Sequence, residues 1–441
     1  MSAGAAGCPS LPPARGARPA PPPLAPEWTL IRRSGALPPP SPIPWRTRLR
    51  QALATLPQER QRTLRAYATA TSGGEAAPLL HPQAALPHPP QGLPPPLLDL
   101  ASNDYLGLSR HPAVLEAAAA ELATSGLGAG ASRLVSGTRP VHLALEDALA
   151  AWLGRERVLL FPSGFQANLA AVTALADRHS LVLADRLIHH SLLAGVRASG
   201  ARLRRFAHND LADLERQLAT ARSERPQARL LVLCESLYSM EGTSPPLAEL
   251  AALCARHNAP LLVDEAHALG VLGAGGRGLA HGLREVALVC GTFGKAFGSG
   301  GAFLAADEPL GEWLLQSSGA FRYTTALAPP LAAGALAALT LLQRDPQAGR
   351  DLCERAGRWR QALAEAGWPR PAGAGPILPL PVGDDRRALA LQHHLETAGL
   401  LTVAIRPPTV PEGSARLRLV LRRDLPPDTR GRLLEALSAA P

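Results

Sequence analysis

The chain contains few cysteines and no long hydrophobic run. Its 441 residues include five cysteines, and no two of them form a CxxC pair. Structural zinc sites use such pairs, and small disulfide frameworks use an even number of cysteines, so the sequence favours a reduced, cytoplasmic chain without a metal site. The most apolar stretch, residues 327–342, is shorter than a transmembrane helix. We expect it to form a buried helix and expect no membrane partner.

Acidic residues are scarce in the first part of the chain. The formal net charge is +9, but residues 1–62 hold nine arginines and two acidic residues, which accounts for +7 of it. The rest of the chain is therefore close to neutral. A protein that binds nucleic acid needs a broad basic surface. We accordingly expect no nucleic-acid partner.

Lysine is almost absent. Lys295 is the only lysine, and the other 44 basic residues are arginines. Arginine stays protonated, whereas a lysine amine can lose its proton and attack a carbonyl carbon. Two interpretations remain open from composition alone: one lysine persisted by chance, or position 295 requires a primary amine, as a Schiff base does.

The N-terminal region is rich in proline and has little capacity to bury a core. Residues 1–44 combine proline, alanine, glycine and arginine, which predicts a disordered arm. Residues 45–100 predict a helix followed by a proline-rich connector. The helix is expected from Trp45 to about Ala70, interrupted near Pro57. Its apolar side is expected to consist of Leu49, Leu53, Leu56 and Leu64.

Residues 101–345 alternate between short apolar runs and helical patterns, which predicts a large α/β domain with a mostly parallel, seven-stranded sheet. The expected strands are Val158–Phe161, Leu181–Ala184, Arg204–Ala207, Leu230–Cys234, Pro260–Val263, Val286–Cys290 and Gly301–Ala305. The expected helices between them include Phe165–Ala176, Leu211–Ala221 and Leu247–His257. In such sheets, ligands bind beyond the carboxyl ends of the strands.

Residues 346–441 predict a smaller α+β C-terminal domain. Its expected elements are a helix at Asp351–Ala366, a strand at Ile377–Val382, a helix at Asp385–Ala398, strands at Leu401–Ile405 and Ala415–Leu421, and a helix at Pro427–Ala439.

Polar residues follow five of the expected strands at the edge where a ligand would bind. The segments are Phe161–Asn168, Asp185 with His189 and His190, Glu235–Ser239, Val263–His267 and Gly291–Gly301. The first passes through a glycine turn into a helix, whose N-terminus suits a phosphate. The last places the only lysine in a glycine-rich turn, where the backbone can approach a ligand closely.

The letters Asp-Glu-Ala-His at residues 264–267 also occur in a helicase box. That alternative requires a GxxxxGK[ST] phosphate loop upstream, and the chain has none. An amine, a carboxylate for a ring nitrogen, a histidine that can stack on a ring and phosphate donors instead suit a flat, phosphorylated aldehyde. Pyridoxal 5'-phosphate fits this description.

At these residues the chain resembles the α-oxoamine synthase family of fold-type-I pyridoxal-phosphate enzymes, from about Trp45 to the C-terminus. The motifs that carry the resemblance are Ser102–Leu108, Ser136–Gly137, Phe161–Asn168, Asp264–His267, Thr292–Gly298, Tyr323–Thr325, Arg406–Pro411 and Ala415–Leu419. The chain departs from the family pattern in its N-terminal arm, in the prolines of residues 78–96 and in the turn at residues 128–132.

The resemblance implies roles for individual residues. Lys295, Asp264 and His189 are implied as catalytic: Lys295 forms the Schiff base, Asp264 holds the pyridinium nitrogen protonated, and His189 stacks on the ring. The cofactor-binding set comprises Gly164, Phe165, His189, Ser239, Asp264, His267, Thr292 and Lys295, with Thr324 and Thr325 reaching the phosphate of a neighbouring subunit. The substrate-binding set comprises Arg65, Asn103, His189, Thr409 and Arg418.

The implied reaction is a decarboxylative condensation of L-alanine with a pimeloyl thioester, in a homodimer with shared active sites. Whether coenzyme A or acyl carrier protein bears the acyl group stays open. Two alternatives also stay open: a sibling synthase that uses glycine or serine with another thioester, and a non-catalytic protein with this fold that acts as a binding or regulatory module.

Overall fold

The computed structural model describes residues 44–62, 64–65 and 97–440. The chain divides into two compact units, Met1–Leu56 and Pro57–Pro441. In the first, helix α1 (Trp45–Ala54) buries none of its residues. The expected arm of residues 1–44 and the prolines of residues 78–96 lie outside the described residues, except for Pro44.

The helix that the sequence predicts from Trp45 to about Ala70 is too long. It ends at Ala54, and Pro57 precedes only a single 3-10 turn at Gln58–Arg60. Proline clashes with the preceding helical turn, which explains the early end. Residues 61, 62, 64 and 65 are not helical, and residues 66–70 lie outside the described part of the chain.

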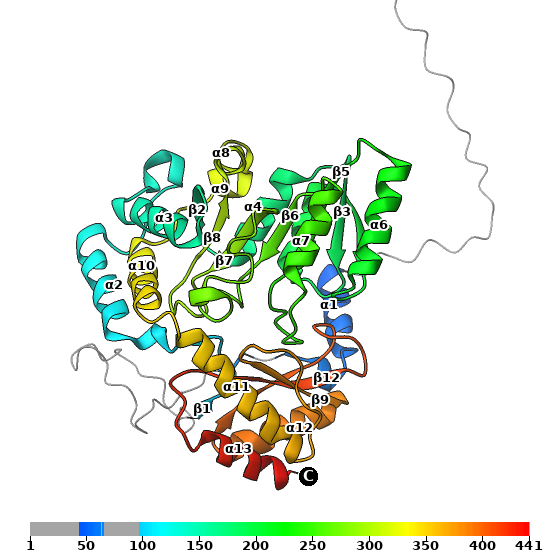
Figure 1. Cartoon of the computed structure of the whole chain (residues 1–441). Helices are drawn as coiled ribbons and strands as arrows, with labels where there is room; N and C mark the ends of the chain where they lie inside the picture. Colours follow the sequence, from blue (N-terminus) through cyan, green and yellow to red (C-terminus); the bar gives the residue numbers. More distant parts are fainter. Residues whose placement is uncertain (1–43, 63, 66–96, 441) are drawn as a thin grey trace, which may run out of the picture. The chain divides into compact units, whose positions relative to one another are not determined.

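The second unit is built on a seven-stranded sheet, as the sequence predicts (Figure 1). The strand order is β2-β8-β7-β6-β5-β3-β4, and all neighbouring pairs are parallel except the two that involve β8. The strands are β2 (Arg157–Phe161), β3 (Ser180–Asp185), β4 (Arg202–Phe206), β5 (Arg229–Glu235), β6 (Leu261–Asp264), β7 (Val286–Thr292) and β8 (Ala302–Ala306).

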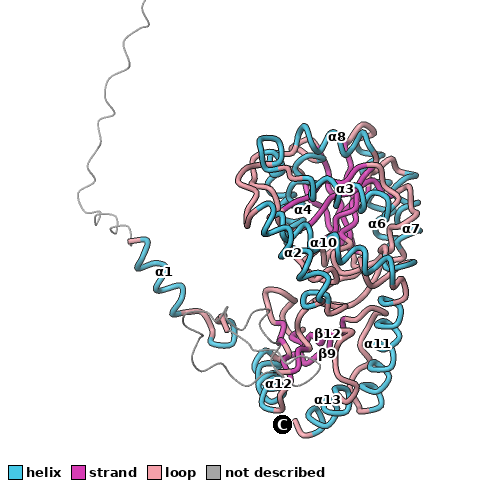
Figure 2. The backbone as a smooth tube through the Cα atoms, turned by 90° about the vertical axis from the view of Figure 1, so that its left-hand side faces the viewer, coloured by secondary structure: helices cyan, strands magenta, loops and turns pink. Residues whose placement is uncertain are grey.

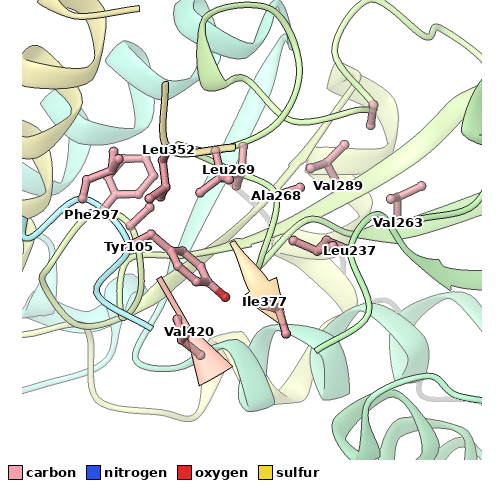
Figure 3. Close-up of a cluster of buried hydrophobic side chains, with 14 of the residues drawn as sticks. Tyr105, Leu237, Val263, Ala268, Leu269, Val289, Phe297, Leu352, Ile377 and Val420 are labelled. Atoms are coloured by element: carbon pink, nitrogen blue, oxygen red, sulfur yellow. The ribbon is translucent and has the colours of Figure 1, made fainter. Parts of the chain in front are cut away.

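The central strands are apolar because helices cover both faces of the sheet. Successive side chains of a strand point to opposite faces. In β5, Val232 and Cys234 pack into one hydrophobic cluster, while Leu231 and Leu233 pack into the other. Figure 3 shows part of the first cluster, including Val263 and Val289. The continuous apolar runs in the sequence therefore reflect burial on two sides.

Before residue 345, the helices contributing to the first cluster are α2 (Pro112–Ser125), α3 (Pro140–Leu153), α6 (Leu211–Glu224), α7 (Leu247–Arg256) and α10 (Pro329–Arg344). Helices contributing to the second are α4 (Gly164–Leu175), α5 (His190–Ser199), α8 (Glu308–Ser317) and α9 (Gly319–Arg322). Figure 2 shows the strands enclosed by helices. The expected buried helix at residues 327–342 is α10. None of the helices in the described residues is both long and apolar enough to cross a membrane.

The C-terminal part forms a three-stranded antiparallel sheet in the order β11-β12-β9, with three helices. Its elements are α11 (Ala348–Glu365), β9 (Ile377–Gly383), α12 (Asp385–Thr397), β11 (Val403–Ile405), β12 (Ala415–Val420) and α13 (Thr429–Ser438).

The strand expected at Leu401–Ile405 is divided in two. Its first part belongs to β10 (Leu400–Leu401), which pairs in parallel with β1 (Leu98–Asp99), whereas β11 pairs with β12. The sequence pattern could not show this division, because β10 is paired with a segment about 300 positions earlier in the chain.

Candidate active site

The carboxyl ends of the central parallel strands meet at one cavity. Glu235 ends β5 and lies beside Asp264, which ends β6 and lies beside Cys290 of β7. The cavity has a volume of about 210 Å³. Its lining contains these expected site residues: Gly164, Phe165, His189, Asp264, His267, Thr292 and Lys295. The structure thus brings together residues that are spread over the sequence from Gly164 to Lys295.

Asp264 is held in one orientation by two donors. Its Oδ2 accepts a hydrogen bond from Asn168 Nδ2 at 2.7 Å, and its Oδ1 accepts one from the Ala266 N–H at 2.9 Å. Asn168 Nδ2 also lies 3.0 Å from Ser191 Oγ. A buried carboxylate of this kind needs a cationic or donor partner. A protonated ring nitrogen in the cavity would supply one.

Lys295 follows β7 in a turn that is fixed on both sides. The rings of Phe293 and Phe297 are fully buried, and the Lys295 carbonyl accepts a hydrogen bond from the Gly298 N–H at 2.9 Å. Gly298 has a positive φ, and a Cβ there would overlap the backbone of Ser109. Close packing against the backbone of Ser109 therefore requires a glycine at position 298, three residues after the lysine.

The amine of Lys295 is poised to lose its proton. Desolvation lowers its pKa to about 8, against the opposing charges of Asp264 and Glu235. Burial disfavours the charged ammonium form. A neutral amine, needed for a nucleophile or base, is therefore well populated near neutral to mildly alkaline pH.

Two histidines line the cavity in their neutral form. His189 is the N-cap of α5, its Nδ1 lies 2.7 Å from Ser191 Oγ, and desolvation lowers its pKa despite the nearby Asp264. Desolvation and the charge of Lys295 lower the pKa of His267 well below its usual value. Neutral imidazoles can stack on a ring or donate one hydrogen bond each.

A helix N-terminus borders the cavity. Ser163 caps α4, its Oγ accepting a hydrogen bond from the Gln166 N–H at 3.3 Å, and Gly164 and Phe165 form the first turn. The first turn of a helix leaves N–H groups without intrahelical partners, and the helix dipole favours an anion there. A Cβ built on Gly164 would lie 3.8 Å from Thr292 Oγ1, so this hydroxyl lies beside Gly164. These groups fit a phosphate.

Arg418, Asn103 and Ser239 form a neighbouring group. Arg418 lies on β12 and is buried. Its Nη2 donates to Asn103 Oδ1 at 2.8 Å, and its Nε donates to the Ser239 carbonyl at 2.6 Å. The sequence alone left Arg418 indistinguishable from a solvent-facing arginine. The structure buries it beside Asn103, 315 positions away.

Four other expected site residues do not line the cavity of this single chain. Thr324 is half-buried, and Thr325 is exposed and forms an antiparallel bridge with Ser132. Thr409 is exposed. Arg65 is exposed and pairs with Glu396 of α12 at 2.7 Å. Arg65 also lies outside a helix, so the expected helical position was wrong.

The sequence reasoning did not assign a role to several residues of the site. Glu235 is buried in the cavity wall, and burial together with the charge of Asp264 raises its pKa well above the usual value. Its position was detectable, because it ends a strand next to the one that ends at Asp264. The contact of the Tyr105 hydroxyl with His267, 162 positions away, was not detectable from local pattern.

Comparison with known proteins identifies relatives of the chain. The family model for class I and II aminotransferases matches residues 95–437. The 8-amino-7-oxononanoate synthase of Chromohalobacter salexigens is 45% identical over 346 residues, which cover 78% of this chain and 89% of the relative.

Solved structures with the same fold are also similar in sequence. One is a crystal structure of 8-amino-7-oxononanoate synthase from Francisella tularensis, with 27% identity and a TM-score of 0.66 over 78% of this chain and 96% of that one. Another is described as SPT with a PLP internal aldimine, with 29% identity and a TM-score of 0.74 over 78% of this chain and 87% of that one.

Proposed function

Because the chain belongs to the class I and II aminotransferase family and, within it, to the 8-amino-7-oxononanoate synthases, we propose that it condenses L-alanine with a pimeloyl thioester in biotin biosynthesis. Its cofactor is pyridoxal 5'-phosphate. The observation that carries the proposal is the placement of the only lysine, with a lowered pKa, in a cavity that also contains Asp264 and His267.

The cavity residues fit this cofactor by their chemistry. We assign Lys295 to its aldehyde, Asp264 to its ring nitrogen, and His189 to the face of its ring. Gly164, Phe165 and Thr292 would hold the phosphate, and His267 and Ser239 the side of the phenolic oxygen. When bound, the cofactor supplies an electron sink for negative charge at the α-carbon of the amino acid.

In the reaction, the neutral amine of Lys295 takes the α-proton of alanine at Nζ. A carbon–carbon bond then forms between the α-carbon and the thioester carbonyl carbon, and the carbon–sulfur bond breaks to release the thiol. Loss of the alanine carboxyl group as carbon dioxide and return of a proton to the same carbon yield the amino ketone.

The buried guanidinium of Arg418, with Asn103 beside it, is proposed to bind the alanine carboxylate. Arginine binds carboxylates through two parallel N–H donors. His189 would contact the amino acid from the cavity wall. Arg65 and Thr409 are proposed to contact the acyl substrate, although both lie outside the cavity of the isolated chain.

We further propose a homodimer in which Thr324 and Thr325 contact the phosphate of the other subunit. Both residues are at least partly accessible in the single chain. Tyr323, which precedes them in the chain, is exposed, and so are Leu134 and Val135, which follow the Ser132 that pairs with Thr325. Burial of such side chains favours association.

The cytoplasm is the proposed location. The four cysteines among the described residues are all free thiols, which suits a reducing compartment. The acyl donor is proposed to be pimeloyl coenzyme A or pimeloyl acyl carrier protein.

A visible spectrum followed by product analysis tests the function. Purified protein with pyridoxal 5'-phosphate should show an imine absorbance that changes when L-alanine is added and stays unchanged with glycine or serine. With alanine and pimeloyl coenzyme A, mass spectrometry should detect the amino ketone and released carbon dioxide. A product formed only from glycine or serine with succinyl, acetyl or long-chain donors would instead identify a sibling synthase. Cofactor binding without any product would favour a regulatory protein.

A further inference from the structure

Tyr105 is fully buried and lies between β1 and α2. Its backbone N–H and its backbone carbonyl are both hydrogen-bonded. Its N–H donates to the Asn103 carbonyl, and its carbonyl accepts from the Arg423 N–H, both at 2.8 Å. Figure 3 shows its ring within the hydrophobic cluster near Phe297 and Val420, with the hydroxyl as the only oxygen among the labelled side chains. A buried hydroxyl is costly unless it is hydrogen-bonded.

The Tyr105 hydroxyl has one close acceptor. Its oxygen lies 2.5 Å from His267 Nδ1, and 3.5 Å from Asn103 Oδ1. The Tyr105 and His267 rings meet edge to face, with their centroids 6.1 Å apart. Burial raises the pKa of Tyr105, and the nearby positive charge of Arg418 opposes this rise only in part. The phenol therefore keeps its proton.

The surrounding geometry decides the direction of this hydrogen bond. Asn103 Oδ1 lies 3.5 Å from the phenolic oxygen and already accepts a hydrogen bond from Arg418 Nη2 at 2.8 Å. A proton on His267 Nδ1 would therefore leave the buried phenol without a close acceptor. The phenolic proton is then directed to the nearer acceptor, His267 Nδ1. Burial lowers the pKa of His267 most, and the positive charges of Lys295 and Arg418 lower it further, so the imidazole is neutral. A neutral imidazole that accepts at Nδ1 carries its only proton on Nε2.

We propose that Tyr105 is a positioning residue that fixes His267 as the Nε2–H tautomer, so that the imidazole offers an N–H donor to the cavity. The consequence for catalysis rests on the function proposed above: the Nε2–H would donate to the phenolic oxygen of the cofactor. The same hydroxyl lies 3.5 Å from Asn103 Oδ1, which accepts a hydrogen bond from Arg418, the residue proposed to bind the substrate carboxylate. One buried phenol thereby orients a cofactor contact before the cofactor binds.

The test is a nitrogen NMR measurement on the cofactor-free full chain, with histidine labelled with nitrogen-15 in the ring. The His267 signals are assigned by their loss in His267→Gln. In the wild-type protein, Nε2 should have the shift of a protonated nitrogen and Nδ1 that of an acceptor. In Tyr105→Phe, which keeps the ring and loses the hydroxyl, the two nitrogens should move toward an average of both tautomers.

Tyr238→Phe is the matched control. Tyr238 is also fully buried, and its hydroxyl accepts a hydrogen bond from the Glu235 N–H at 3.4 Å without contact to His267. This variant should leave the His267 tautomer as in the wild type. A wild-type His267 protonated at Nδ1 would overturn the proposal, and so would a Tyr105→Phe variant that retains the Nε2–H tautomer.

A second measurement uses only the wild-type protein, in case Tyr105→Phe does not fold. The Tyr105 hydroxyl proton should show scalar coupling to His267 Nδ1 across the hydrogen bond. Coupling to Nδ1 supports the proposal, and a proton that is covalently bound to Nδ1 refutes it. All of these measurements are made without cofactor or substrate. The tautomer proposal can therefore be refuted while the synthase activity is found, and it can be supported while the activity is absent.

Discussion

Lys295 is the residue on which the chemistry depends. Surface lysines can be replaced by arginine at little cost, and in this chain arginine provides every other basic side chain. The structure places the remaining lysine beside two carboxyl groups in a cavity, where burial lowers the pKa of its amine to about 8. The chance interpretation of a single lysine does not account for this placement.

Lys295→Arg should abolish turnover while the protein stays folded. Arginine keeps the positive charge but cannot supply a neutral amine, and loss of a general base alone costs about 100- to 10,000-fold. The measurement is product formation from alanine and pimeloyl coenzyme A, with circular dichroism and thermal unfolding as checks of folding. Activity within tenfold of the wild type would refute the assigned role.

The amine of Lys295 should react with acylating reagents at unusually low pH. Because its pKa is lowered to about 8, the neutral fraction rises as the pH increases through 8. At pH 8 about half of the amine would be neutral, compared with roughly 0.3% for an amine of ordinary pKa. Labelling the cofactor-free protein with limiting acetic anhydride, followed by peptide mass mapping, gives the titration curve.

Only one peptide can contain an acetylated lysine side chain, because the chain has a single lysine. A free lysine derivative in the same tube serves as the reference. A midpoint at pH 10 or above would show that the cavity does not depress the pKa.

At the scale of an element, the segment after β6 is held by the buried carboxylate of Glu265. Its two oxygens accept hydrogen bonds from the N–H groups of Leu279 and Ala280 at 3.0 and 2.8 Å, and it also contacts Ser236. Desolvation raises the pKa of Glu265 to about 7. Two adjacent carboxyl groups at the end of β6 thus have different roles: Asp264 lines the cavity, and Glu265 binds the segment at residues 279–280.

Gly278→Ala should destabilise the protein more than Gly282→Ala. Both glycines have a positive φ, for which an alanine costs about 1–2 kcal/mol. At Gly282 the added Cβ meets no atom, whereas at Gly278 it would overlap the Glu265 carboxylate. Displacing that carboxylate leaves buried N–H groups unpaired, which adds about 1–3 kcal/mol.

Chemical denaturation of the two variants measures this difference. Gly282→Ala serves as the control for backbone strain alone. Equal losses of unfolding free energy in the two variants would show that Glu265 does not fix this segment.

At the scale of the whole molecule, a single chain does not bring every expected site residue to the cavity. Asn103, Ser239 and Arg418 form a separate group beside its lining, and Thr324, Thr325, Thr409 and Arg65 also stay outside it. For the two threonines a second subunit offers a physical explanation, since both follow the exposed side chain of Tyr323 and Thr325 pairs with Ser132. The division of the chain near residue 345 remains a prediction.

Val135→Asp should weaken the proposed homodimer. The Val135 side chain is 78% exposed in the single chain, and a charge there would have to be desolvated on association. Sedimentation velocity should show a shift from dimer to monomer, together with weaker binding of pyridoxal 5'-phosphate. Leu203→Asp, an exposed apolar position on the edge strand β4, is the matched control and should remain dimeric. A dimer unaffected by Val135→Asp would place the interface elsewhere.

The sequence by itself determined the elements and the residue types of the site. Apolar runs that are buried on two faces identified six of the seven strands, the exception being the Arg-rich edge strand β4, and polar residues at strand ends identified Asp264, His267 and Lys295, because both signals are local. Tertiary structure decided what depends on distant partners: the split of β10 from β11, the burial of Arg418 beside Asn103, and the contact of Tyr105 with His267. It also decided the pKa values, since desolvation depends on everything packed around a group and not on its neighbours in the chain.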